Sequence, residues 1–296
     1  MTFHIYHNTR FTYQQWVGFS HNLVRLCPRT TEYQQLSDFD ISVEPSAVEL
    51  DAYDDLFGNR LHHILVREPH LVLNVTARST VIIDPRGLEK MEERRKKALS
   101  VTYEQALKGM EKIDPEIIYA KQFLLPSPLI GAVTSEMKKY ILSSIHPERS
   151  MYEGLLEYTQ RIFHDFTFEN GFSNITTDPK EVYSEKKGVC QDFAHFMIAT
   201  LRSIGLSARY VSGYIETLPP LGQEKLFGVD ASHAWVSVFI PNHGWFEFDP
   251  TNNMVPQERH ILLGYGRDYN DISPIQGVVV GSGMSHLEVM VDVSRK

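Results

Sequence analysis

Two kinds of hydrophobic pattern divide the chain. Over residues 3–83, apolar and polar positions alternate in stretches such as HIYHNTRFTY and HLVLNVTARSTVII. This period of two is typical of half-buried strands. The motif IIDPRG ends the alternation, because proline and glycine interrupt regular structure. The pattern predicts an antiparallel β-rich N-terminal domain over residues 1–83.

Beyond this motif the apolar positions recur every three or four residues, as in helices. The predicted helices lie within 88–109, 133–145 and 150–166, and Ser150 with Glu153 forms a capping box at the start of the last one. Residues 84–130 are predicted to form a helical linker between domains, and 131–296 a second domain. Strand patterns return from residue 206 in LSARYVSGYIE, SHAWVSVFI, GWFEFD and SHLEVMVDV. The second domain is therefore expected to combine helices with strands.

Composition excludes several classes of function. The 296 residues favour about two domains, and 42% are hydrophobic and 22% charged, as in globular proteins. The sequence has no apolar run of ~18 residues and no recognisable signal peptide, which predicts a cytoplasmic protein without a membrane partner. A net charge of −8 disfavours nucleic acid as a partner, and the basic cluster RRKK at 94–97 is interpreted as a solvated helix face. The oligomeric state stays open.

One of only two cysteines, Cys190, follows a predicted helix boundary. Asp178 is a predicted N-cap with Pro179 at the first helical position, and this short helix is expected to end at Gly188. We expect Gly188 to use backbone angles closed to other residues, so that a second helix begins near Cys190. The other cysteine, Cys27, is predicted to be a buried thiol. The two cysteines do not form a disulfide framework.

The second predicted helix places Cys190 in its first turn. Its apolar positions recur at helical spacing until Gly205: Phe193, Met197, Leu201 and Ile204. The positive end of the helix dipole and the free backbone N–H groups favour a thiolate there, and could also receive an oxyanion. A buried packing cysteine is the equal alternative on this evidence, because free cysteine is among the most buried residue types.

A hairpin supplies two further reactive groups. The turn PNHG joins the strands SHAWVSVFI and GWFEFD, so His233 at the start of the first lies near Asp249 at the end of the second. Simple pairing of the two strands about the turn leaves His233 and Asp249 a few residues out of register, so a bulge or a bend is expected to bring them together. Attack on an amide needs a thiolate, an imidazole that carries the proton, and a carboxylate that fixes the imidazole. Cys190, His233 and Asp249 are therefore the predicted catalytic residues.

The same residue types are also compatible with two other functions. Cys190, His195, His233 and Asp249 could ligate a metal, but the sequence lacks the closely spaced pairs of a structural zinc site, and no metal is expected. A protein that has the fold of such an enzyme but only binds peptides, without catalysis, is a further alternative.

Three neighbours of the predicted triad are candidate substrate-binding residues. Gln191 and Asp192 lie in the first turn beside Cys190, although Asp192 could instead complement the helix dipole. Trp235 shares a strand face with His233 and could shield its imidazole, or could simply pack in the core.

Taken together, these blocks resemble the transglutaminase-like superfamily, in its bacterial cysteine-protease type. The resemblance rests on GVCQDFAHFMIATLRSIGLSARYVSGY, SHAWVSVFIPNHGWFEFDPTNN and ERHILLGYGRDYNDISPIQGV. The segments YHNTRFTY, LCPRT, FGNRL and ARSTV are similar to the bacterial transglutaminase-like N-terminal region. The fold class implied is α+β, with a papain-like core after an antiparallel β domain.

The resemblance also implies an activity: acyl transfer through a thioester on Cys190, with His233 and Asp249 completing the triad and no cofactor. We expect hydrolysis of a peptide or small amide, with a protein-glutamine transglutaminase using an amine acceptor as the alternative. No tryptophan of the core precedes Cys190 to match the oxyanion-hole indole of animal transglutaminases. The second oxyanion donor is therefore unassigned.

Overall fold

The computed structural model describes residues 1–217, 226–228, 230–281 and 283–295, and confirms the mixed class of helices and antiparallel sheets. The strands are β1 (Thr2–Val17), β2 (Phe19–Val24), β3 (Gln34–Glu44), β4 (Glu49–Asp54), β5 (Arg60–Val66), β6 (His70–Ile83), β7 (Thr167–Phe168), β8 (Lys187–Gly188), β9 (Ala208–Ile215), β10 (Ser232–Ile240), β11 (Gly244–Phe248), β12 (His260–Gly266), β13 (Ile275–Val280) and β14 (Ser285–Arg295). The helices are α1 (Pro85–Ala98), α2 (Tyr103–Gly109), α3 (Pro115–Lys121), α4 (Ser135–Leu142), α5 (Met151–Asp165), α6 (Pro179–Glu185), α7 (Cys190–Ser203) and α8 (Tyr269–Ile272), with a short 3₁₀ helix η1 (Gln122–Leu124).

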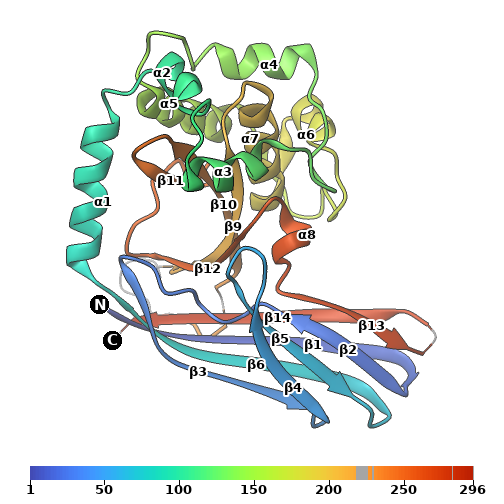
Figure 1. The fold of residues 1–296 in the computed structure, drawn as a ribbon. Helices are drawn as coiled ribbons and strands as arrows, with labels where there is room; N and C mark the ends of the chain where they lie inside the picture. The colour runs from blue at the N-terminus through green and yellow to red at the C-terminus, as the bar shows by residue number, and fades with distance from the viewer. Residues whose placement is uncertain (218–225, 229, 282, 296) are drawn as a thin grey trace.

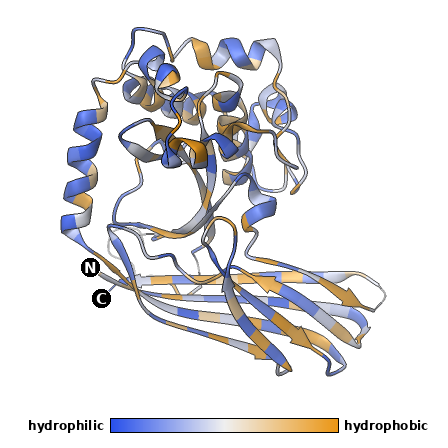
Figure 2. Ribbon diagram, in the orientation of Figure 1, coloured by the Kyte–Doolittle hydropathy of each residue, from blue (hydrophilic) through white to orange (hydrophobic). Residues whose placement is uncertain are grey.

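Two antiparallel sheets form a β sandwich at the bottom of Figure 1. Their strand orders are β14-β1-β6-β3 and β13-β2-β5-β4. Along β6 buried residues alternate with more exposed ones, as period-two patterning requires, and the colours of the sandwich strands alternate accordingly in Figure 2. The space between the sheets is filled by buried side chains from both of them: Val24, Leu26, Ile64, Val66, Leu73, Val75 and Ala77.

The sandwich also takes strands from the far end of the chain. β14 pairs with β1 from Phe3↔Arg295 to Tyr13↔Ser285, and β13 pairs with β2. The predicted second domain of 131–296 thus contains two strands whose hydrogen bonds are made to the N-terminal sheets. Alternation of apolar residues identifies a strand but not its partner, so the sequence pattern did not place β13 and β14 in the sandwich.

A third four-stranded sheet, the core sheet, has the strand order β11-β10-β9-β12 and is covered by helices on one face (Figure 1). The buried apolar stripe of α7 packs against alternate residues of β10: Ala194, Met197, Ile198 and Leu201 from the helix, and Ala234, Val236, Val238 and Ile240 from the strand. Burial of a large aliphatic side chain stabilises a fold by roughly 1.5–3 kcal/mol. This packing therefore fixes the position of the α7 N-terminus relative to β10.

Helix α1 leads from the sandwich to the helical layer (Figure 1). It is mostly hydrophilic, as Figure 2 shows, and among its residues only Gly87 and Ala98 are buried. The predicted linker 84–130 is helical, with α1, α2, α3 and η1 inside it. Among the described residues, no helix combines the length and apolar character needed to span a bilayer.

Two side-chain amides of the sandwich bind the edge of the core sheet at β12. Gln34 donates to the carbonyl of Leu262 at 2.8 Å and accepts its N–H at 2.8 Å. Asn59 donates to the carbonyl of Tyr265 at 2.7 Å and accepts its N–H at 2.9 Å. Each amide thus supplies the two hydrogen bonds that a neighbouring strand would supply. A Cβ on Gly264 would lie 2.3 Å from the Asn59 Oδ1 atom, so this approach requires glycine.

Replacing Gln34 by alanine should loosen this junction. The substitution leaves the N–H of Leu262 buried without its acceptor, and an unpaired buried group costs ~1–3 kcal/mol. We expect Gln34→Ala to lower the free energy of unfolding by about 2 kcal/mol in urea titrations followed by circular dichroism. Gln35→Ala, at the exposed neighbouring position, is the matched control and should change little. Equal effects of the two substitutions would contradict this account.

Candidate active site

Cys190 is the first residue of α7, as the sequence predicts. Val189 before it is extended, with φ −115° and ψ −179°. The Asp192 carboxylate accepts the N–H of Val189 at 2.7 Å and the hydroxyl hydrogen of Ser173. N–H groups in a first helical turn have no acceptor within the helix. At Cys190 they are therefore available to a thiolate or an oxyanion.

The turn before α7 differs from its prediction. Asp178 caps α6 as expected, accepting the N–H of Lys180 at 2.8 Å. The left-handed residue that ends this helix is Lys186, with φ 55°, and not Gly188. A Cβ on Gly188 would lie 2.8 Å from the Cβ of Asp192. Glycine is thus needed there for close approach to the capping side chain and not for its backbone angles.

The β10–β11 hairpin brings His233 and Asp249 together. Its register is regular, from Ile240↔Gly244 to Val236↔Phe248, so no bulge closes the predicted offset. Extension of this register places Asp249 opposite Trp235, which makes His233 its diagonal neighbour on the same face. The side chains span the remaining gap, and His233 Nε2 lies 2.8 Å from Asp249 Oδ2.

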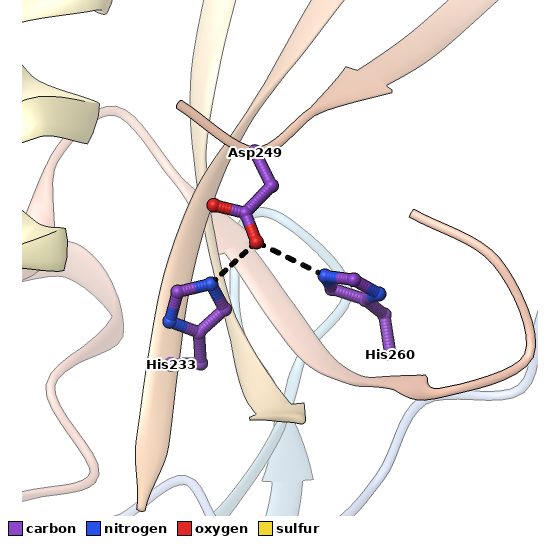
Figure 3. A group of neighbouring side chains, drawn as sticks. All are labelled: His233, Asp249 and His260. Carbon is purple, nitrogen blue, oxygen red and sulfur yellow. Dashed lines mark hydrogen bonds and ion pairs between the residues drawn. The ribbon is translucent and has the colours of Figure 1, made fainter. Parts of the chain in front are cut away.

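The carboxylate of Asp249 is surrounded by donors. It is fully buried, and Figure 3 shows His233 and His260 approaching the same oxygen, Oδ2. His260 Nε2 is 3.2 Å from that oxygen, and the amide of Asn252 donates to it at 2.8 Å. The other oxygen, Oδ1, accepts the backbone N–H groups of Thr251 and Asn252 at 2.9 and 3.2 Å. Burial alone would raise the pKa of Asp249, but the hydrogen bonds from His233 and His260 outweigh burial and hold the pKa below its usual range.

His233 is bound on both sides. Burial lowers its pKa, but hydrogen bonds to Asp249 and Cys190, together with the charges of these residues, outweigh burial and raise the pKa of His233 to about 10. Because Nε2 faces Asp249, Nδ1 is the ring nitrogen left for Cys190. The structure therefore brings the three predicted catalytic residues together, with His233 between Cys190 and Asp249.

The indole of Trp235 packs against the imidazole of His233. The two rings stack at a centroid distance of 5.9 Å and an interplanar angle of 28°. Trp235 is fully buried, and its indole N–H donates to Glu247 at 2.9 Å. A Cβ on Gly213 would lie 2.4 Å from the indole, so glycine makes room for the ring. This geometry fits the predicted shielding and core-packing roles, whereas a substrate contact for Trp235 stays a prediction.

The other predicted substrate-binding residues lie beside Cys190. Gln191 donates through its side chain to the carbonyl of Ile175 at 3.2 Å. Asp192 is only 1% exposed, and burial raises the pKa of its carboxyl group. Its bonds to Val189 and Ser173 assign it a capping role, and substrate binding by either residue stays a prediction. His195 is also buried, and its Nε2 accepts the N–H of Tyr269 at 3.1 Å.

The sequence prediction missed Asn252 and His260. Asn252 follows Asp249 by three positions within DPTNN, and asparagine in such a turn often bonds nearby backbone or side chains. That signal could have identified it. His260 lies on β12, on the far side of β9 from His233 in the core sheet. Its contact with Asp249 depends on strand order, for which no local signal exists.

The cluster of His233, Asp249 and His260 also has the residue types of a metal site. One possible ligand atom of each lies within 4.8 Å of the others. Hydrogen bonding explains the same spacing, because each imidazole can donate its Nε2 proton to the carboxylate. The expectation of no bound metal stays a prediction, which zinc analysis of the purified protein would test.

Comparisons with known proteins agree with this geometry. Residues 3–82 match the model of the bacterial transglutaminase-like N-terminal region, and residues 139–250 match that of the transglutaminase-like superfamily. An uncharacterized protein of Mycobacterium tuberculosis is 34% identical over 302 residues, which cover 98% of this chain and 92% of that protein. The chain belongs to the transglutaminase-like superfamily. The segment matched to the superfamily includes Cys190, His233 and Asp249.

More distant relatives differ in how much of the chain they share. A protein of Mycobacterium leprae is 27% identical over 98% of both chains. A protein-glutamine gamma-glutamyltransferase of Pseudomonas aeruginosa is 35% identical over 77 residues, only 26% of this chain and 12% of that enzyme. The crystal structure of a putative cysteine protease from Cytophaga hutchinsonii superimposes with a TM-score of 0.75 over 99% of this chain and 90% of its own, at 22% identity. This likeness confirms the predicted fold, a transglutaminase-like core with an N-terminal β region.

The two cysteines should differ strongly in reactivity. Cys27 is buried, and burial raises the pKa of its thiol to about 11. Cys190 lies at a helix start against His233. We expect iodoacetamide to label Cys190 at least about a hundredfold faster than Cys27 at pH 7, because the thiolate is the reactive form. Peptide mass spectrometry of a time course measures both rates in one sample. Equal, slow labelling would instead support a packing role for Cys190.

Proposed function

We propose that this protein is a cytoplasmic cysteine-dependent acyl-transfer enzyme that hydrolyses peptide or amide bonds through a thioester on Cys190. The observation that carries the proposal is that His233 lies between Cys190 and Asp249, with its Nε2 atom 2.8 Å from Asp249 Oδ2. This arrangement joins a nucleophile at a helix start to an imidazole that an ionised, buried carboxylate orients. The substrates are small peptides or amides, and no cofactor takes part.

The first half of the reaction forms the thioester. The Cys190 thiolate attacks the carbonyl carbon, a C–S bond forms, and the carbonyl oxygen becomes an oxyanion beside the first turn of α7. His233 then transfers its Nδ1 proton to the amide nitrogen as the C–N bond breaks, and the amine leaves. Asp249 holds the Nε2 proton throughout, so the ring keeps Nδ1 directed at the reacting atoms.

The second half regenerates the enzyme. Water gives a proton to His233 Nδ1 and adds its oxygen to the thioester carbon. The C–S bond then breaks, the thiolate returns to Cys190 and the carboxylic acid product departs. A primary amine in place of water would give transamidation by the same residues, so the choice depends on which nucleophile reaches the thioester.

Two features bear on that choice. In favour of water, the chain has three tryptophans, Trp16, Trp235 and Trp245, and none lies in the core before Cys190, where animal transglutaminases have one. In favour of an amine, the Pseudomonas relative is named as a glutamyltransferase, although the shared region is short. We favour hydrolysis, and keep transamidation as the second candidate function.

Substitutions in the triad should separate an enzyme from a peptide-binding module. Cys190→Ala removes the nucleophile, and we expect loss of turnover with unchanged circular dichroism. Cys27→Ala is the matched control and should keep its turnover. A binding module would show no turnover in the unmodified protein, and binding would persist in Cys190→Ala.

The pH dependence should report the His233–Asp249 pair. The pKa of His233 is about 10, so the imidazolium needed as an acid is present below that value and is lost as pH rises through it. We expect kcat to fall above pH ~10, and to fall at lower pH in Asp249→Asn, because asparagine brings no negative charge to stabilise the imidazolium. Asp249→Asn should also lower kcat by up to about 10⁴-fold, the loss that follows the same substitution in a Ser-His-Asp triad. If kcat of Asp249→Asn fell at the same alkaline pH as kcat of the unmodified protein, the result would contradict the pairing of His233 with Asp249.

Product analysis can show whether water or an amine takes the acyl group from the thioester. The protein is incubated with a peptide library in ¹⁸O-labelled water and excess primary amine, and products are read by mass spectrometry. We expect cleaved peptides or amides that carry ¹⁸O in the new carboxyl group. Predominant amine adducts at glutamine side chains would promote the transglutaminase candidate instead.

A further inference from the structure

The carboxylate that orients the catalytic imidazole is bonded by a second histidine. His260 Nε2 lies 3.2 Å from Asp249 Oδ2, the same oxygen that binds His233 at 2.8 Å. Both histidines and the aspartate are buried. Since this oxygen belongs to an ionised carboxylate and can only accept, the facing nitrogen of His260 carries the proton.

His260 is itself held in place. Its ring meets the indole of Trp235 edge-on, at a centroid distance of 5.2 Å and an interplanar angle of 80°. Its backbone opens β12 opposite Ile215 of β9. Two residues further on, Leu262 is bound by the amide of Gln34 from the sandwich. A side chain fixed by strand and ring together can direct its proton at one oxygen with little loss of conformational entropy.

Strand β12, through His260, completes the support of the Asp249 carboxylate. Asn252 and the backbone of its turn bind Asp249 from the residues that follow it. Those donors move with Asp249, because all belong to one short turn. His260 is the donor that ties the carboxylate to β12, which lies beyond β9 from the hairpin that carries His233. Without it, the turn could shift as a unit and change the angle at which Oδ2 meets His233.

We propose that His260 is a positioning residue for the triad: its Nε2–H holds Asp249 so that Oδ2 stays aligned with His233. The inference rests on the proposed function, since it concerns the same Cys190–His233 pair. It assigns His260 no contact with substrate. The residue acts through Asp249, and the sandwich contributes by holding β12.

Two variants that differ by one methylene group test the idea. In His260→Gln the side-chain amide nitrogen can reach about as far as Nε2, whereas in His260→Asn it is too short to reach Asp249. Alkylation of Cys190 by iodoacetamide is measured from pH 5 to 10, since it needs no substrate. We expect His260→Asn to shift the labelling profile upward by about one pH unit, because a weaker Asp249 contact destabilises the imidazolium opposite the thiolate.

The Gln variant should keep the profile of the unmodified protein. Imidazole ¹H–¹⁵N spectra provide a second measurement: the strongly hydrogen-bonded Nε2–H signal of His233 should move in His260→Asn and stay in His260→Gln. His70→Asn, at a buried histidine of the sandwich, is the control and should leave both measurements unchanged. If His260→Asn does not fold, the spectrum and profile of His260→Gln decide alone, and a shifted profile overturns the proposal.

Other outcomes are equally distinct. Unmodified profiles in both variants would show that Asp249 is positioned without His260. Equal shifts in both, with equal losses of thermal stability, would show that the imidazole serves packing only. In each of these cases fast labelling of Cys190 in the unmodified protein would leave the proposed function standing. Slow labelling there, with no amide cleaved, would instead remove the proposed function.

Discussion

An ionised carboxylate with no access to water constrains the whole site. Removing a charge from water costs several kcal/mol unless donors replace the lost solvent. Asp249 is supplied with donors from β10, from its own turn and from β12. The core sheet must therefore be correctly assembled across its width before the charge is tolerated. The orientation of the imidazole is in this sense a property of the sheet and not of one hairpin.

The opposite side of His233 depends on a helix end. The Asp192 carboxylate caps α7 through the N–H of Val189, which leaves the first-turn N–H groups directed at the position of Cys190. The apolar stripe of α7 is buried against β10, so the helix start and the imidazole share one rigid support. Such preorganisation matters because donors that are already in place need no rearrangement when negative charge develops.

Much of this arrangement follows from local sequence, and the rest does not. The helix start at Cys190 and the hairpin of His233 and Asp249 were predictable, since caps, apolar periodicity and a turn motif act over a few residues. The reason why position 188 requires glycine was not predictable, because it depends on a contact with Asp192 that only the folded turn creates. The bonds of Gln34 and Asn59 to β12 span more than 200 positions. His260 was missed for a similar reason, as strand order cannot be derived from alternation.

The pairing of β14 with β1 sets an order of events during synthesis. Residues near position 3 hydrogen-bond to residues near 295, so β1 is synthesised about 280 residues before its partner β14. At typical translation rates of ~5–20 residues per second this interval lasts tens of seconds. Meanwhile β6 can cover one edge of β1, but the other edge stays open for pairing with foreign strands. Until β14 has been made, this open edge of β1 is therefore a site at which nascent chains can aggregate.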